Sequence, residues 1–181
     1  MALKNFPLWK TLRIGGVPRE EVLSWIPDPY VHRHDGEVRN ELQKRLLDCK
    51  GFRTERESRE LRLGRANLVD LEFIEGRNPT TTEILDRICF WGHQPCPIEV
   101  GPWLRKVYRN QPEDEMLDIA MDPLVSIAEI TKIKECHIFY LDMFDGQPRL
   151  GLCHAGSVEF VGPQYNLGDR YYRPHGKQMV Y

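Results

Sequence analysis

Apolar residues recur at helical spacing along the first third of the chain. Pro18 suits the first turn of a helix that ends before Pro27. A second helix is expected over residues 37–49, with Gly51 closing it. The pattern therefore predicts that the N-terminal part, residues 1–66, is mainly helical.

The end of this part is rich in arginine. Arginines recur at every third position, namely Arg53, Arg56, Arg59, Arg62 and Arg65. At 100° per residue, this spacing spirals around a helix instead of forming one stripe. The segment is either a nucleic-acid-binding arm or a solvated stretch whose charges compensate one another. Interleaved glutamates favour the second interpretation, because they cancel most of the field that phosphate binding needs.

A helix–turn–helix unit is expected in the middle of the chain. Thr80 and Glu83 fit the capping box that begins a helix, which predicts a helix over residues 81–91. A short turn follows, and Pro97 can open another helix that runs to about residue 110.

The pattern also contains several strands. Residues 68–76 mix β-forming residues with alternating acids, and residues 116–122 have one apolar face. Asp145 and Gly146 suit the two-residue type I′ turn of a hairpin, and the segments after it look like two more strands. The core-facing residues of the hairpin are expected to be Phe139, Leu141, Leu150 and Leu152.

The hairpin turn also fixes which residues lie opposite one another. A two-residue turn at Asp145–Gly146 places His137 opposite His154, close enough for the pair to share a metal ion. The same face carries the apolar residues of the hairpin. Two half-buried histidines in a sheet are therefore the favoured interpretation, and no metal site is predicted.

The predicted elements give an α+β fold. Helices come first and strands last, which argues against a parallel α/β arrangement. We expect a single domain, residues 1–181, in which a helical N-terminal part and the helix–turn–helix unit pack on an antiparallel sheet of four to five strands. Residues 67–181 contain a strand, two helices and then the antiparallel β part.

Composition limits the classes of function. The net charge of −2 provides no global field that would recruit nucleic acid or an anionic membrane. We find no signal-peptide pattern and no apolar run of membrane-spanning length. The cysteines are few, scattered and odd in number, which is typical of reduced thiols in a cytoplasmic protein. No nucleotide, metalloprotease or hydrolase motif occurs, so no cofactor is predicted.

The segment from Cys96 to Pro112 is the candidate functional site. Arg105 supplies a cation that suits a carboxylate or phosphate, with Tyr108 and Glu99 beside it. We expect these residues to open onto a concave surface, while the prolines and Leu104 with Val107 belong to the scaffold. The alternative is structural: Glu99 favours the helix dipole, Tyr108 is core, and Arg105 pairs with an acid.

The same segment carries a resemblance to a known family. It resembles a family of small bacterial proteins of uncharacterised function, found in environmental and candidate-phyla genomes. These share a C-P-x-E-x-G-P-x-L-R-x-x-Y-x-x-Q-P block followed by an I-A-M-x-P strand. The block falls on Cys96, Pro97, Glu99, Gly101, Pro102, Leu104, Arg105, Tyr108, Gln111 and Pro112. Residues 91–93 and a longer insertion over 125–135 depart from the pattern. The resemblance implies a bacterial, intracellular protein and no particular chemistry.

Three functions are compatible with these features. The preferred one is a binding module for a small anionic ligand or a peptide, because no nucleophile–base pair can be named from spacing. The alternative is a small hydrolase or transferase that uses Glu99, Arg105 and Tyr108. Nucleic-acid binding through the helix–turn–helix unit is third, since its charges are nearly balanced. Membrane association is not expected.

Overall fold

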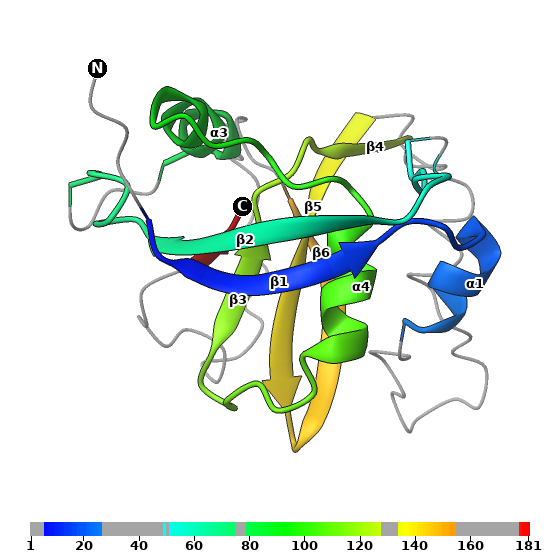
Figure 1. Cartoon of the computed structure of the whole chain (residues 1–181). Coiled ribbons are helices and arrows are strands. Elements are labelled where there is room, and N and C mark those ends of the chain that lie inside the picture. Colours follow the sequence, from blue (N-terminus) through cyan, green and yellow to red (C-terminus); the bar gives the residue numbers. More distant parts are fainter. Residues whose placement is uncertain (1–5, 27–48, 50, 75–78, 128–133, 155–177) are drawn as a thin grey trace.

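The computed structural model is an α+β protein (Figure 1). It describes residues 6–26, 49, 51–74, 79–127, 134–154 and 178–181. No helix among these residues is long and apolar enough to cross a membrane. The elements in chain order are β1 (Leu8–Ile14), α1 (Arg19–Ser24), β2 (Arg59–Asn67), α3 (Thr81–Phe90), α4 (Val100–Val107), β3 (Met116–Ile119), β4 (Leu124–Ile127), β5 (Lys134–Phe144), β6 (Gln147–His154) and β7 (Gln178–Val180).

The strands are hydrogen-bonded in the order β1-β2-β7-β3-β5-β4, with β6 on β5. The β3–β7 pair is parallel and the other pairs are antiparallel. The expected sheet of four to five strands is not confirmed, because seven strands join this path among the described residues. Two of these strands, β1 and β2, come from the part that was expected to be helical.

The mainly helical N-terminal part is therefore not confirmed. Only α1 lies there as a described helix, and the helix expected over residues 37–49 falls outside the described residues apart from its last position. The arginine-rich stretch forms β2. Leu61 and Leu63 alternate with charged residues and face the core, so a two-residue period outweighs the three-residue spacing of the arginines.

The strand expected over residues 68–76 is also wrong where the structure describes it. β2 ends at Asn67, and the chain then turns back on itself. The amides of Leu71 and Phe73 donate to the carbonyls of Asn67 and Leu68, which are local turn bonds and not ladder bonds. Leu71 and Phe73 belong to a small core with Leu68 packed against it, whereas Val69 and Ile74 are exposed.

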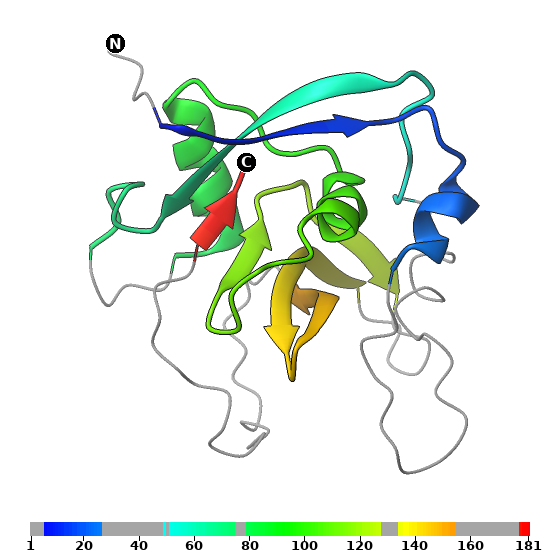
Figure 2. The same ribbon diagram turned by 60° about the horizontal axis from the view of Figure 1, so that its bottom comes forward.

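Helix α4 lies at the centre of the fold. Figure 2 shows it between the β1–β2 ribbon and the strands β5 and β6. Val100 and Leu104 are fully buried, whereas Val107, which was expected to be buried, is 53 % exposed. Gly101 permits the close approach to β5, because a Cβ there would lie 2.7 Å from the Phe139 ring.

The β5–β6 hairpin matches its prediction. Asp145 and Gly146 have φ angles of 52° and 69°, as a type I′ turn requires. Of the four residues expected to face the core, Phe139, Leu141 and Leu150 are fully buried and Leu152 packs against the core. The inward face of the hairpin is therefore confirmed.

The hairpin register also pairs His137 with His154, as predicted. The His137 side chain is buried, and that of His154 lies outside what the structure describes. Among the described residues, no group of three or more histidine, cysteine, aspartate or glutamate side chains could hold a metal ion.

The two helices of the expected helix–turn–helix unit pack in different places. Ile84 and Ile88 of α3 belong to the small core around Leu71, whereas α4 belongs to the main core. The capping box of α3 is confirmed. The Thr80 hydroxyl accepts from the Glu83 amide at 3.2 Å, and the Glu83 carboxylate accepts from the Thr80 amide at 2.9 Å.

Removal of the cap should weaken the protein slightly. We expect Thr80→Ala to lower the free energy of unfolding by about 1 kcal/mol, because the Glu83 amide loses its acceptor. Thr80→Ser keeps the hydroxyl and should stay close to wild type. Urea denaturation measures both variants, and an unchanged midpoint with an unchanged m-value for Thr80→Ala would contradict the cap's contribution.

Candidate functional site

Glu99 is held inside the protein. It precedes α4 as its N-cap residue and is 1 % exposed. One carboxylate oxygen accepts from the amide of Glu55 at 2.9 Å, and the other accepts from the indole of Trp103 at 2.9 Å. Because both oxygens have internal donors, Glu99 joins the segment before β2 to the start of α4.

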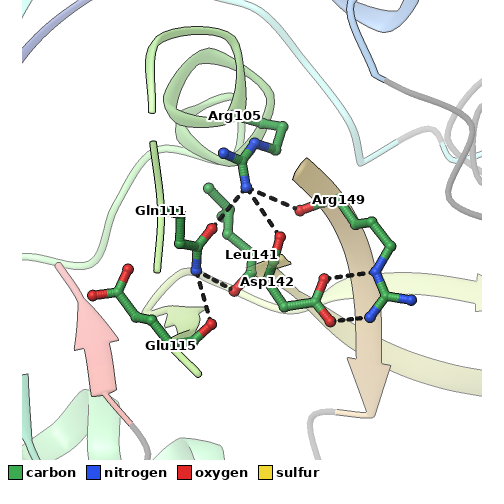
Figure 3. A network of polar contacts seen from close by, with 6 residues as sticks. All are labelled: Arg105, Gln111, Glu115, Leu141, Asp142 and Arg149. Carbon is green, nitrogen blue, oxygen red and sulfur yellow. Dashed lines mark hydrogen bonds and ion pairs between the residues drawn. The ribbon is translucent and has the colours of Figure 1, made fainter. Parts of the chain in front are cut away.

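Arg105 is the largest fully buried side chain and is 1 % exposed. Its Nη1 donates to Gln111 Oε1 at 2.7 Å and to the carbonyls of Asp142 and Arg149 at 3.2 and 3.4 Å (Figure 3). Nε and Nη2 have no hydrogen-bond partner among the described residues. Burial, with a smaller effect of Arg109, lowers the pKa of Arg105 to about 10, so the guanidinium stays charged at neutral pH.

Gln111 extends the contacts of Arg105 to the sheet. Its Nε2 donates to the carbonyls of Glu115 and Leu141, each at 3.1 Å (Figure 3). The structural alternative paired Arg105 with an unspecified acid. The nearby Asp142 carboxylate accepts from Arg149 across the hairpin. The network therefore fastens α4 and the loop after it to β5 and β6.

Tyr108 contacts this network through Glu115. Its hydroxyl donates to Glu115 Oε2 at 2.8 Å, while Glu115 Oε1 pairs with Arg65 at 2.7 Å. The Trp9 ring packs edge-on against Tyr108, and the Lys10 ammonium lies 4.5 Å from the centre of the Tyr108 ring. Burial and the bond to Glu115 raise the pKa of Tyr108 to about 12, so the phenol stays protonated at neutral pH.

The three candidate residues therefore do not converge. Within the described part of the chain, no hydrogen bond joins any two of Glu99, Arg105 and Tyr108. Arg105 does not open onto a concave surface, because it is almost completely buried. Ligand binding by these residues stays a prediction, and their observed contacts are those of a scaffold.

A cavity of about 770 Å³ lies elsewhere, beside β2. One wall consists of β2 at residues 59 and 61–64, and the other of residues 92–97, which lead from α3 to α4. Residues 6–8, Glu55, Asp122 and Tyr181 complete the lining. We call this cavity the β2 groove. In Figure 1 the segment between α3 and α4 runs along β2 on the side opposite β1.

The edge of β2 that faces this groove is unpaired among the described residues. β1 pairs with residues 59–64 on one side of β2, and β7 pairs with residues 65–67 on the other. Gly64 and Tyr181 exchange two backbone bonds, of 2.9 and 3.4 Å, and extend the β7 ladder by one pair. No described strand lies beside residues 59–63 on that side.

The Gly64–Tyr181 pair shows which backbone groups point to the free edge. Both backbone groups of Gly64 point away from β1, toward Tyr181. Successive residues of a strand direct these groups to alternate sides, so those of Arg62 and Glu60 point the same way as those of Gly64. Their side chains are exposed, whereas the side chain of Leu63 is buried. Two backbone donors and two acceptors are therefore available at the edge.

The groove has an apolar, aromatic end near Gly64. The rings of Phe6, His93 and Tyr181 lie 5.1–5.6 Å apart, centre to centre. At the opposite end, Arg59 pairs with Glu55 at 3.1 Å. Cys96 lines the groove too, but burial raises the pKa of its thiol to about 12, so the thiol stays protonated and is no activated nucleophile.

The β2 groove was not predicted from the sequence. The signal for the strand was present, since Leu61 and Leu63 alternate with charged residues. The open edge had no local signal, because β7, which pairs with the neighbouring residues of β2, lies far away in sequence.

No protein-family model matches the chain, and no curated protein or solved structure matches it either. The resemblance to the bacterial family stays a prediction.

Proposed function

We propose that this protein is a binding module that holds an extended peptide segment of a partner protein in the β2 groove. The observation that carries the proposal is the edge of β2: no described strand pairs with Arg62 and Glu60 on the side away from β1, and Arg62 lines the cavity of about 770 Å³. The segment would add a strand to the sheet. Main-chain hydrogen bonds then provide affinity, and alternate side chains provide specificity.

The shape of the groove favours a single strand as the occupant. An exposed edge can also pair with the sheet of a second copy. Residues 92–97 form the opposite wall, so a strand in the groove has protein on both sides. A peptide segment meets that condition. The β2 strand of a second copy does not, because it brings its own β1 with it.

The side chains of the groove favour binding over catalysis. The Cys96 thiol is protonated, and Arg59 at one end of the groove is paired with Glu55. Glu99 and Arg105 lie outside the lining and have internal partners. Glu99 and Arg105 instead position α4, and residues 92–97, which form one wall of the groove, lead directly to this helix.

A proline substitution at the edge tests strand addition. Arg62→Pro removes the backbone N–H that points into the groove. The N–H groups that bond to β1 belong to other residues and are kept, and proline is tolerated at such edge positions. Arg62→Ala removes the same side chain and keeps the N–H. The probe is a fluorescein-labelled pool of hexapeptides in which valine alternates with glutamate, lysine or threonine.

We expect fluorescence anisotropy to detect binding of the pool to wild type and Arg62→Ala. Arg62→Pro should bind about tenfold more weakly than Arg62→Ala, because one hydrogen bond is lost and the ring obstructs its neighbour. Circular dichroism should show both variants folded. Equal binding by the two variants, or no binding of the pool to wild type, would refute the proposal.

A further inference from the structure

We infer that the bound peptide runs antiparallel to β2, in line with β7, and places an acidic side chain beside Arg62 and a basic one beside Glu60. This inference rests on the proposed function and specifies the direction and chemistry of its ligand.

The direction follows from the strand that already occupies part of the edge. β7 runs antiparallel to β2, with Val180 opposite Arg65 and Tyr181 opposite Gly64. The next places along this line are opposite residues 63 to 59, where no described strand lies. Gly64 and Tyr181 exchange two backbone hydrogen bonds. A peptide that binds antiparallel can form the same pair of bonds with Arg62 and again with Glu60.

The two faces of the added strand meet different surroundings. Side chains opposite Arg62 and Glu60 lie on the exposed face of the ribbon. Those opposite Leu63 and Leu61 lie on the face that packs toward the core. Because strand side chains alternate, the ligand should carry apolar residues at every second position and charged ones between them.

Arg62 and Glu60 decide the order of the ligand charges. Neither side chain forms an ion pair with another described residue, whereas Arg59 is already paired with Glu55. Opposite charges directly across an antiparallel pair attract, and like charges repel. Reading the ligand from its N-terminus, the acidic residue therefore precedes the basic one by two positions.

Two labelled peptides with the same composition test this order. The matched peptide is Val-Glu-Val-Lys-Val-Thr, and the swapped peptide is Val-Lys-Val-Glu-Val-Thr. The swapped peptide also tests the direction. If it bound parallel to β2, it would place its glutamate beside Arg62 and its lysine beside Glu60, as the matched peptide does when it binds antiparallel. Each peptide is titrated by anisotropy against wild type and against the charge-exchanged double variant Arg62→Glu/Glu60→Arg.

We expect wild type to bind the matched peptide roughly 3- to 10-fold more tightly, and the double variant to reverse this preference. The preference should weaken at high salt. Equal affinities would overturn the charge order and leave strand addition standing. A wild-type preference for the swapped peptide would overturn the antiparallel direction. Binding of neither peptide would overturn both the inference and the proposed function.

Discussion

Replacing Arg105 by alanine should lower the free energy of unfolding by about 3–5 kcal/mol, an effect typical of removing a large buried side chain. Arg105 is the largest fully buried side chain, and its Nη1 bonds to Gln111 and to two carbonyls of the β5–β6 hairpin. The alanine variant leaves a cavity and unpaired acceptors beneath α4. Urea denaturation with a constant m-value measures the loss.

Two control variants separate the effect of the lost Arg105 volume from the effects of its charge and of its position on α4. Arg105→Met keeps most of the volume and removes a charge that has no carboxylate bonded to it, so we expect a smaller loss of about 1–3 kcal/mol from the unpaired acceptors. Val107→Ala changes the exposed side of the same helix and should stay within about 0.5 kcal/mol. A loss below about 1 kcal/mol for Arg105→Ala would show that Arg105 is not structural.

Leu150→Ala should destabilise the protein by about 2–5 kcal/mol. Leu150 lies opposite Leu141 in the hairpin, and both side chains are fully buried in the main core next to α4. Thermal or urea denaturation measures the change. Leu150→Met conserves volume and should cost less than about 1.5 kcal/mol. Equal stability of the alanine variant and wild type would mean that the hairpin does not pack as described.

The elements that sequence reasoning predicted correctly have local causes. The capping box at Thr80 depends on a residue three positions away, and the turn at Asp145–Gly146 depends on two residues with positive φ. Once this turn type is known, the whole register of β5 and β6 follows. That is why the burial of Phe139 and Leu150 could be predicted as well.

The elements that were missed depend on distant partners. β2 is a strand because β1 lies beside it, and the charges of the arginine-rich stretch concealed the alternation of Leu61 with Leu63. Tertiary pairing outweighs local pattern in such segments. The chain after Asn67 contains β-forming residues, yet it turns, and the turn is held by bonds from the Asn67 amide to the Asp70 carboxylate and from the Asp70 amide to the Asn67 side chain.

The candidate site shows the same limit. Arg105 and Glu99 were expected to open onto a concave surface, because a guanidinium suits an anionic ligand. Both are buried, since amide, indole and carbonyl groups from several elements meet them inside the protein. A sequence does not reveal such convergence. The block from Cys96 to Pro112 is special because α4 occupies the centre of the fold, and its conformation places the wall of the β2 groove.

The most direct test of strand addition is amide hydrogen exchange, followed residue by residue by NMR with and without saturating Val-Glu-Val-Lys-Val-Thr. The amides of Arg62 and Glu60 point away from β1, as that of Gly64 does, whereas those of Leu61 and Leu63 point to β1. We expect the peptide to slow exchange at Arg62 and Glu60 by about tenfold or more, and to change Leu61 and Leu63 much less. Peptide binding that leaves the exchange of Arg62 and Glu60 unchanged would contradict strand addition at this edge.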